Sequence, residues 1–264
     1  MTGNDIDSRE EVLRAAIDAA GREARSFLAE PSRLAVGLKG HQDFISAADS
    51  AVERLLKERL IGAFPTDAFL GEETGGNRGA HLWVVDPIDG TANFVRGLPH
   101  FCVSVALLVG GEMTLAAILD PVLEELYFAR RGRGATRNER PVAVSPTVRM
   151  REAAIEIGWS PRVANARYLE CLSRTLAAGA AVRRGGSGAL GLAYVADGRS
   201  DAYAELHINA WDCLAGLLIV REARGRISPF LAEGGLERGG PILASAPGIA
   251  VALSEITGIP LEPG

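Results

Sequence analysis

WVVDPIDGTANF, residues 83–94, is the stretch that decides the fold. Its first three residues form a short apolar run of the kind that makes a buried strand. Pro87 fixes its own φ and pushes Asp86 towards an extended backbone, and Gly90 permits a backbone angle or a close approach that a Cβ would block. From Thr91 the chain can begin a short helix whose free N–H groups face the turn. The stretch therefore predicts two carboxylates, a hydroxyl and a helix N-terminus at the end of a buried strand.

The two carboxylates of this stretch, Asp86 and Asp89, suggest a metal site. Two carboxylates about 5 Å apart repel each other by about 3 kcal/mol at an effective dielectric constant of about 20. A fold tolerates such a pair if one carboxyl is protonated or a cation lies between them. Carboxylates and a backbone carbonyl are hard oxygen ligands that suit Mg²⁺ or Mn²⁺. A simpler interpretation stays open at this point: an ordinary turn in which Asp89 caps the helix and Asp86 makes an Asx turn.

The composition argues against several classes of protein. A net charge of −5 over 264 residues is unfavourable for a broad nucleic-acid interface. No run approaches about 18 apolar residues, and the acidic N-terminus lacks the apolar core of a signal peptide, so no membrane span is expected. The three cysteines, Cys102, Cys171 and Cys213, have neither metal-binding nor disulfide spacing, which fits a reducing compartment and predicts a cytoplasmic protein.

Capping signals and apolar periodicity predict two helices in the first part of the chain, over residues 8–31 and 46–61. An antiparallel meander is predicted over residues 82–143, with a hairpin turn at Gly110-Gly111. Residues 1–143 are therefore expected to form helices packed on one face of an antiparallel sheet.

From residue 144 the pattern changes to alternating strands and helices, which predicts a second, more α/β-like subdomain over residues 144–264. The predicted strands are 154–157, 180–182 and 202–204, with two more near 227 and 242–244. The predicted helices are 160–179, 188–196, 211–223 and a last helix at the C-terminal end. No internal repeat or Pro-rich linker separates the two halves, so they are expected to share an extensive interface.

Acidic residues recur at strand ends and helix starts. Asp49 begins the second helix, Glu72 follows a predicted strand, and Asp212 opens a later helix. Each has a simpler explanation, because an aspartate favours a helix N-terminus and Glu72 could be a solvated loop charge. Together with Asp86 and Asp89, however, they occupy the positions at which α/β folds collect ligands.

Three motifs follow one another along the chain: GEE at 71–73, DPIDGTANF at 86–94 and WDCLAG at 211–216. FISAAD at 44–49 and DAYAEL at 201–206 fall in place around them. In order and spacing they resemble the signature of the inositol monophosphatase family, a group of Mg²⁺-dependent, lithium-sensitive phosphomonoesterases. With the elements predicted above, the expected fold is α+β: a layered αβαβα sandwich with an antiparallel sheet in the N-terminal half and a mixed sheet in the C-terminal half.

The resemblance implies two to three Mg²⁺ ions, with Mn²⁺ as an alternative, and assigns their ligands. Glu72, Asp86 and the backbone carbonyl of Ile88 would hold the first metal. Asp86, Asp89 and Asp212 would hold the second, and Glu72 would also touch a third, weaker ion. The N-terminal half would thus carry most metal ligands, whereas the C-terminal half would supply Asp212 and the alcohol contacts.

The resemblance also implies catalytic and substrate-binding roles. Thr91, hydrogen-bonded to Asp49, would orient the attacking water, and Glu72 completes the implied catalytic set. The backbone N–H groups of Gly90 and Thr91 would receive the phosphate. The residues that would contact the substrate are Asp89, Gly90, Thr91, Gly186, Ser187, Glu205 and Asp212. Of these, Gly186, Ser187 and Glu205 would face the alcohol part.

The reaction explains why these residue types are needed. A phosphate monoester is an anion that repels hydroxide, so its hydrolysis in water is extremely slow. Paired metal ions about 3.5 to 4 Å apart lower the pKa of water, neutralise the phosphoryl oxygens and stabilise the leaving alkoxide. Such a pair needs several carboxylates, at least one of which bridges, and Asp86 is the natural bridge. No serine, cysteine or histidine nucleophile is required.

The chain departs from the family pattern at three places. Lys39 is one residue out of register with a family lysine, Ser187 replaces a threonine, and the loop at 74–80 is short. In the family this loop helps to shape the site, so the identity of the alcohol part of the substrate stays open. Inositol monophosphate is the first choice, because TANF after DG resembles the inositol enzymes. The alternatives are compounds that related enzymes hydrolyse: histidinol phosphate, fructose 1,6-bisphosphate and nucleotide 3′-phosphates.

Two other functions also stay open. Gly186, Gly188 and Gly191 spell GxGxxG after a short strand, a pattern that could begin the dinucleotide site of an oxidoreductase. A binding or regulatory protein could keep the same site without turnover. For the phosphatase, the expected partner is a small phosphomonoester, with no nucleic acid and no membrane, and the resemblance implies a homodimer.

Overall fold

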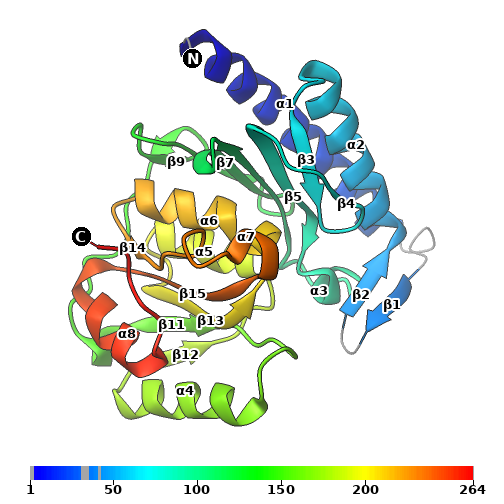
Figure 1. The fold of residues 1–264 in the computed structure, drawn as a ribbon. Coiled ribbons are helices and arrows are strands. Elements are labelled where there is room, and N and C mark those ends of the chain that lie inside the picture. The colour runs from blue at the N-terminus through cyan, green and yellow to red at the C-terminus, as the bar shows by residue number, and fades with distance from the viewer. Residues whose placement is uncertain (1–2, 31–35, 41–42, 264) are drawn as a thin grey trace.

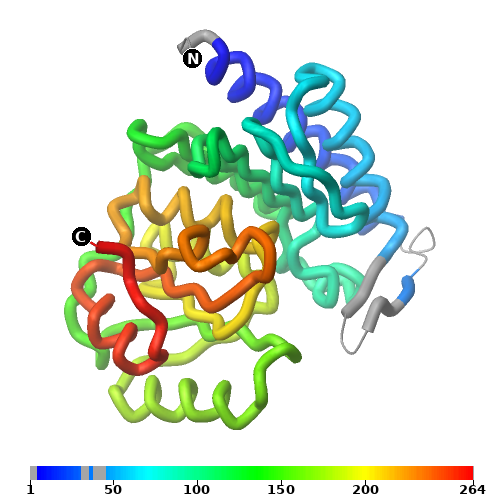
Figure 2. Tube along the Cα trace, viewed as in Figure 1, coloured from blue at the N-terminus to red at the C-terminus, as the bar shows by residue number. Residues whose placement is uncertain are grey.

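A computed structural model describes residues 3–30, 36–40 and 43–263 (Figure 1, Figure 2). Within these ranges the helices are α1 (Gly3–Ala29), α2 (Ala47–Ala63), α3 (Thr91–Phe94), α4 (Asn165–Ala177), α5 (Gly188–Ala196), α6 (Ala210–Glu222), α7 (Gly235–Arg238) and α8 (Ala250–Thr257), with 3-10 turns η2 (Met150–Glu152) and η3 (Pro247–Ile249). The strands are β1 (Val36–Gly40), β2 (Asp43–Ser46), β3 (Ala68–Gly71), β4 (Gly75–Gly76), β5 (His81–Asp89), β6 (Cys102–Val109), β7 (Glu112–Asp120), β8 (Glu125–Arg130), β9 (Ala135–Arg137), β10 (Arg140–Pro141), β11 (Ala154–Ile157), β12 (Ala181–Arg183), β13 (Ala202–Ile208), β14 (Arg226–Ile227) and β15 (Gly240–Ser245).

The strands form two large sheets and a small β1–β2 hairpin. The first sheet has eight strands in the order β10-β9-β8-β7-β6-β5-β3-β4, and its pairings are antiparallel except that of β3 with β5. The second has five strands in the order β12-β11-β13-β15-β14, parallel from β12 to β13 and antiparallel beyond. The predicted α+β class is therefore confirmed, with one mostly antiparallel sheet and one mixed sheet.

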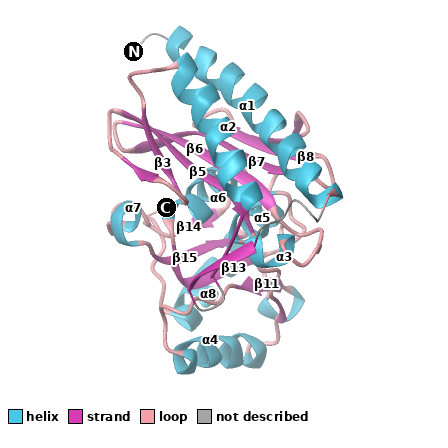
Figure 3. Cartoon of the chain, turned by 90° about the vertical axis from the view of Figure 1, so that its right-hand side faces the viewer, coloured by secondary structure: helices cyan, strands magenta, loops and turns pink. Residues whose placement is uncertain are grey.

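Three separate apolar cores show that helices and sheets stack in five layers. Trp83 and Val85 of β5 pack against α1 and α2, whereas Leu82 and Val84 point into the core that contains α5 and α6. This alternation follows from the period of two along a strand. A third core lies between the second sheet and the pair α4 and α8. The layers run α1/α2, first sheet, α5/α6, second sheet, α4/α8 (Figure 3), so the predicted αβαβα sandwich is confirmed.

The middle layer explains why α5 and α6 lack a polar face. All 9 residues of α5 are buried, because the helix lies between two sheets and must be covered on every side. Glycines let the two helices approach closely, since a Cβ on Gly216 of α6 would lie 2.4 Å from the Cβ of Leu192 in α5. Residues from both halves of the chain share this core. The proposed division into 1–143 and 144–264 stays a prediction.

The predicted hairpin between β6 and β7 is confirmed. Val109 pairs with Glu112, and the two turn residues, Gly110 and Gly111, have φ values of +58° and +85°. Two-residue hairpins of this kind need positive φ at both positions, which glycine adopts without steric cost.

Two predicted helix starts are wrong. The first helix begins at Gly3 rather than Ser8, so Ser8 lies inside the helix and does not cap it. The helix predicted from residue 160 begins only at Asn165. Its expected first residue, Ser160, instead closes a turn, with Val163 N donating to Ser160 O at 3.2 Å. Capping residues serve turns as readily as helices, so they mark a boundary without saying which element follows.

The strand predicted at 202–204 is longer than expected. It continues as β13 to Ile208, because β15 pairs with it from Ala202 to Glu205 and, after an irregularity, again at Ile208; Glu205 lies opposite Ile242. This extension places Glu205 on a rigid sheet rather than in a loop.

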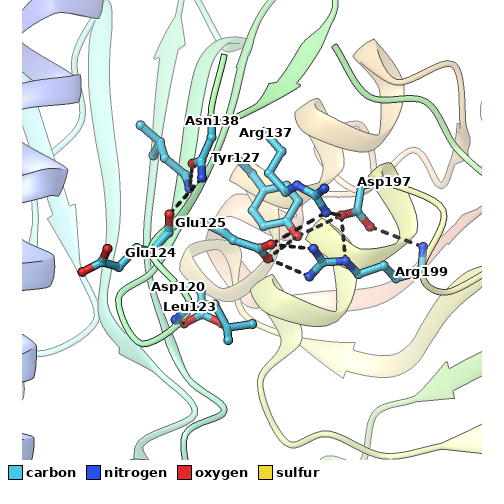
Figure 4. A network of polar contacts seen from close by, with 10 residues as sticks. Asp120, Leu123, Glu124, Glu125, Tyr127, Arg137, Asn138, Asp197 and Arg199 are labelled. Atoms are coloured by element: carbon cyan, nitrogen blue, oxygen red, sulfur yellow. Dashed lines mark hydrogen bonds and ion pairs between the residues drawn. The ribbon is translucent and has the colours of Figure 1, made fainter. Parts of the chain in front are cut away.

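A polar network ties the first sheet to the middle layer (Figure 4). Tyr127 Oη of β8 and Arg137 Nη1 of β9 donate to Asp197 Oδ2, just after α5, at 3.0 and 2.6 Å. Arg199 donates twice to the Glu125 carboxylate of β8, both times at 2.6 Å. Burial, followed by the charge of Asp197, raises the pKa of Tyr127, which keeps its hydroxyl a donor.

A buried ion pair fixes α1 over the first sheet. Arg9 donates to both oxygens of the Asp67 carboxylate, from Nη2 at 2.7 Å and from Nε at 2.9 Å. Trp83 Nε1 donates to the same carboxylate at 3.0 Å. The side chains of Arg9 and Asp67 are 5% and 0% exposed. Arg9 Nη1 also pairs with Asp5, whose side chain is 37% exposed, so the loss of Asp67 leaves Arg9 with this weaker partner alone.

We expect Asp67→Asn to lower the free energy of unfolding by about 1.5 to 3 kcal/mol, because Arg9 loses its buried counter-ion and keeps only the partly exposed Asp5. The matched control is Asp18→Asn, which breaks the exposed Asp18–Arg22 pair on α1, the helix that also carries Arg9. It should lower the free energy of unfolding by less than about 1 kcal/mol. Urea denaturation followed by tryptophan fluorescence measures both. If both variants lost the same free energy of unfolding, the buried pair would contribute no more to stability than the exposed one.

Candidate metal centre

Three carboxylates from distant parts of the chain meet at the end of β5. One ligand atom from each of Asp86, Asp89 and Asp212 lies within 4.8 Å of the others. Asp86 and Asp89 are 1% and 7% exposed. Asp212 lies in the first turn of α6, where Asn209 N and Nδ2 both donate to Asp212 Oδ2. The predicted gathering of these three side chains is therefore present.

A bulge in β5 brings two of these carboxylates onto the same side. Residues three apart on a regular strand point to opposite faces. Between Asp86 and Asp89, however, β5 contains one residue more than β6, because Asp86 pairs with Ser104 and Asp89 with Cys102. Pro87 lies in this extra stretch, where the ladder needs no N–H from it. The sequence DPID thus sets both the end of the pairing and the direction of the two side chains.

The simpler interpretation of the turn is right for one aspartate and wrong for the other. Asp86 Oδ1 accepts from Ile88 N at 3.0 Å, as in an Asx turn. Asp89 does not cap the helix that follows it, since the N-cap of α3 is Gly90. Asp89 instead caps α5, almost 100 residues later: its Oδ2 accepts from Ala189 N at 2.8 Å and from Ser187 Oγ.

Burial and mutual repulsion set the charge state of the cluster. The pKa of Asp86 is raised well above its usual value, first by burial and then by the charges of Glu72, Asp89 and Asp212. Burial also raises the pKa of Asp89, against the hydrogen bonds from Ser187 and from the start of α5. Burial and the Asp89 charge raise the pKa of Asp212 to about 6. Three carboxylates at this separation are stabilised as anions by a divalent cation, which supplies the missing positive charge.

Glu72 joins the cluster from the neighbouring strand. It follows β3 directly, and its backbone N donates to Val85 O at 3.1 Å, which continues the pairing of β3 with β5. The charge of Glu72 is the largest electrostatic influence on the Asp86 pKa after burial. The structure thus places Glu72 near enough for its charge to act on Asp86, but Glu72 is not one of the three carboxylates that lie within 4.8 Å of one another.

Thr91 and Asp49 are in contact beside the acidic cluster. Thr91 Oγ1 lies 3.2 Å from Asp49 Oδ1 and 3.0 Å from Ile88 O, so its single proton is shared between the two acceptors. Asp49 is fully buried in the first turn of α2, where Ser46 completes the predicted capping box. Burial raises the pKa of Asp49, and the hydrogen bonds from Ser46 and Thr91 oppose that rise.

Gly90 can only be glycine in this arrangement. Its φ is +95°, and a Cβ would lie 3.1 Å from His100 O and 3.2 Å from the Cβ of Ser187. The turn after β5 therefore lies directly against the loop that leads into α5.

A cavity of about 180 Å³ opens beside the aspartates. The residues that line it are Asp89, Glu156, Gly158, Trp159, Arg184, Gly186, Ser187, Gly188, Tyr203, Glu205, Ile208 and Asp212. Glu205 accepts from Tyr203 Oη at 2.5 Å, and burial raises its pKa to about 8. The cavity therefore contains Gly186, Ser187 and Glu205, which sequence reasoning assigned to the alcohol part of a substrate.

Sequence reasoning missed two residues that hold the loop at 184–187, which leads into α5. Asn93 Nδ2 donates to His100 O at 2.8 Å and to Gly185 O at 3.0 Å. Glu156 is 2% exposed, and its Oε1 accepts from Gly185 N at 2.6 Å. A carboxylate within the apolar strand AIEI was the signal that could have identified Glu156. The side chain of Lys39 lies outside the described part of the chain, although its backbone belongs to β1.

The GxGxxG pattern does not form a dinucleotide site. The preceding strand, β12, is an edge strand of only 3 residues. Gly188 N and Ala189 N at the start of α5 donate to the Asp89 carboxylate, so the amides that a pyrophosphate needs are already engaged. Gly191 is required for another reason, because a Cβ there would lie 2.7 Å from the Tyr203 ring.

The donor set fits magnesium or manganese. The three grouped side chains, Asp86, Asp89 and Asp212, offer only oxygen atoms. Burial, and then the charges of Glu72, Asp89 and Asp212, raise the pKa of Asp86, so a cation would stabilise the ionised cluster. Nitrogen and sulfur donors, which favour zinc or copper, are not part of the grouping found in the described ranges. The structure thus defines an αβαβα protein with a buried carboxylate centre beside a polar cavity.

Comparisons with known proteins agree with this description. Residues 5–257 match the model of the inositol monophosphatase family. An inositol-1-monophosphatase of Rhizobium meliloti is 42% identical over 258 residues, covering 95% of this chain and 96% of that protein. Nus factor SuhB of Xylella fastidiosa is 41% identical over 223 residues, covering 83% and 81%. The crystal structure of the extragenic suppressor protein suhB from Bartonella henselae has a TM-score of 0.88 at 35% identity, covering 94% of this chain and 97% of that one.

The chain therefore belongs to the inositol monophosphatase family. It is an enzyme of the phosphoric monoester hydrolase class, of the inositol-phosphatase type.

The raised pKa values predict how the metal-free protein responds to pH. On folding, the pKa of Asp212 rises from 3.8 to about 6 and that of Glu205 from 4.5 to about 8. Between these limits the folded protein binds more protons than the unfolded chain, so the free energy of unfolding falls as pH rises. We expect the Tm in EDTA to fall between about pH 5 and about pH 8.5, and Mg²⁺ to raise it most at the alkaline end.

Differential scanning fluorimetry measures this response. Asp212→Asn should flatten the lower part of the pH slope, whereas the exposed control Asp18→Asn should not. A Tm that rises with pH in EDTA over the same interval would contradict the assigned pKa shifts.

Proposed function

We propose that the protein hydrolyses a small phosphomonoester in a Mg²⁺-dependent reaction, with inositol monophosphate as the first candidate. The observation that carries this proposal is the convergence of Asp86, Asp89 and Asp212 within 4.8 Å beside a polar cavity. A buried group of like charges costs free energy, and a fold retains such a group where a cation and an anionic substrate make use of it.

In this proposal the carboxylates divide between two principal metal positions. Glu72, Asp86 and Ile88 O would hold the first ion, and Asp86, Asp89 and Asp212 would hold the second, with Asp86 common to both sets. Glu72 would also contact a third ion. When bound, the ions supply a nucleophile of lowered pKa and neutralise charge on the phosphoryl and leaving oxygens.

The remaining residues orient the reactants. The Thr91 hydroxyl donates its proton to Asp49 or to the Ile88 carbonyl, so a lone pair on its oxygen would accept a hydrogen bond from the attacking water and hold that water in line with the phosphorus. Backbone N–H groups of Gly90 and Thr91 receive the phosphate. Gly90 can approach the ligand closely because it lacks a Cβ.

The alcohol part would occupy the cavity of about 180 Å³. Glu205 and Ser187 offer polar atoms from its wall, and both are held by the fold: Glu205 by Tyr203, and Ser187 by Asp89. The hydroxyl groups of a polyol both donate and accept hydrogen bonds, so they are suited to the polar atoms of Glu205 and Ser187. Histidinol phosphate, fructose 1,6-bisphosphate and nucleotide 3′-phosphates are the alternative substrates.

A second candidate function is binding without obligatory turnover. It is favoured by one observation: a relative at 41% identity is named as a Nus factor. Phosphate release that depends on Mg²⁺ separates the two, because a protein that only binds does not release phosphate.

Three further properties belong to the proposal. We propose a homodimer, inhibition by lithium and a cytoplasmic location, as for the family it belongs to. None of the helices in the described residues combines the length and apolar character that a bilayer span requires.

The direct test is a screen of phosphomonoesters with and without Mg²⁺, with phosphate release as the readout. We expect release only with Mg²⁺ or Mn²⁺, and fastest with inositol monophosphate. Preference for another of the four substrates would change the proposed alcohol, and release that does not respond to EDTA would overturn the metal-dependent reaction.

Asp89→Asn should lower kcat at saturating Mg²⁺ by at least about 100-fold. Even the residues that support metal ligands cost about 10- to 100-fold when replaced, and Asp89 is proposed as a ligand itself. Circular dichroism and Tm check that the fold is kept, and Asp18→Asn is the activity control. Near-normal turnover of Asp89→Asn would count against the second metal position.

Glu205→Gln should change the ranking of substrates rather than the Mg²⁺ requirement. Above about pH 8, where Glu205 is ionised, the amide can still accept at one atom but loses the second acceptor that a polyol hydroxyl or an amine would use, so the assay is run there. The ratio of kcat/KM for inositol monophosphate to that for a nucleotide 3′-phosphate measures this change. An unaltered ratio would remove Glu205 from the alcohol site.

A further inference from the structure

Glu53 is a buried carboxylate that the reaction described above does not use. It lies on α2, is 1% exposed, and faces the turn that follows β3. Its Oε2 accepts from Glu73 N at 2.8 Å and its Oε1 from Thr74 N at 3.0 Å. Both acceptor atoms are thus directed at the backbone of the loop that carries Glu72.

The chain leaves room for this carboxylate at one position. A Cβ added to Gly71 would lie 2.4 Å from Glu53 Oε2 and 2.8 Å from Oε1. Gly71 therefore lets the carboxylate lie flat against the end of β3. The glycine of the motif GEE is needed for this contact, and not for a turn with positive φ.

The loop at Glu72 is held from both sides. On one side, Glu72 N donates to Val85 O and keeps the residue in register with β5. On the other side, the next two amides donate to Glu53. Hydrogen bonds from N–H groups to a carboxylate are charge-assisted and are among the stronger ones in proteins. They offset the cost of burying the Glu53 charge.

Asp49 and Glu53 are four residues apart and share one face of α2. Asp49 contacts Thr91, and Glu53 contacts the Glu72 loop. One helix thus contacts both Thr91 and the loop that carries Glu72.

We propose that Glu53 is a positioning residue of the metal centre: through the amides of Glu73 and Thr74 it holds Glu72 within reach of the ion bound at Asp86. This inference rests on the proposed metal-dependent function. It assigns no contact with metal or substrate to Glu53 itself. Residues that orient metal ligands in this way typically contribute about 10- to 100-fold to metal affinity.

The test compares three single variants of the full chain with the wild type. Glu53→Gln is isosteric but directs an NH₂ group at a backbone amide, so it loses one of the two hydrogen bonds. Gly71→Ala keeps the Glu53 charge but pushes the carboxylate off the loop. Glu58→Gln is the matched control, because Glu58 is an exposed glutamate on the same helix.

Two readouts separate positioning from stability. Titration with Mn²⁺, followed by electron paramagnetic resonance of the free ion, measures the metal Kd without turnover, and fluorimetry in EDTA measures Tm without metal. We expect the Mn²⁺ Kd to rise about tenfold or more in Glu53→Gln and in Gly71→Ala, and to stay unchanged in Glu58→Gln. The Mg²⁺ concentration for half-maximal phosphate release should rise in parallel.

A purely structural role would lower the Tm and leave the Mn²⁺ Kd of the folded protein within about twofold of wild type; that result overturns the inference. If Glu53→Gln does not fold, Gly71→Ala decides on the same criterion. If the wild type itself binds no Mn²⁺, the metal-dependent function fails and the inference falls with it. If the wild type binds Mn²⁺ and the variants bind it with the same Kd, only the proposed role of Glu53 is overturned.

Discussion

The structure depends on holding like charges together. Asp86, Asp89 and Asp212 lie within 4.8 Å of one another in a buried setting, and their pKa values are raised by burial and by mutual repulsion. Separate elements fix each one: a bulged strand, a helix start and the cap of a second helix. Because each carboxylate is held by its own hydrogen bonds, the cluster does not relax by moving apart. A divalent cation is the partner that such a frame is suited to receive.

The five-layer arrangement makes this rigidity possible. The apolar helices α5 and α6 fill the space between the two sheets, and their N-termini both point to the end of β5, where Asp89 caps one and Asp212 belongs to the other. On the opposite face of the first sheet, α2 supplies Asp49 and Glu53 from one side. The centre is therefore surrounded by regular elements, whose backbones move less than loops and whose side chains are already oriented before a ligand arrives.

Much of this could be predicted because the informative residues are close in sequence or periodic. The hairpin at Gly110-Gly111, the capping box at Ser46 and the apolar helix at 188–196 each follow from local rules. The helix starts predicted at Ser8 and at residue 160 were wrong, because a residue type that caps helices also occurs inside helices and in turns. Glu53, Asn93 and Glu156 were missed for another reason: each acts on a backbone amide or carbonyl far along the chain, and a backbone group leaves no trace in the sequence.

The amino-acid sequence by itself determined the class of fold, the family and the set of acidic residues, because periodicity, glycine and proline positions and motif spacing are properties of the chain alone. Only the tertiary structure decided how those acids are used. It put Asp86 and Asp89 on one side through a bulge, turned Asp89 from a cap of its own helix into the cap of α5, and joined Glu53 to the Glu72 loop. The reason is physical: distances between residues many positions apart, and the burial that raises their pKa values, exist only once the layers have packed.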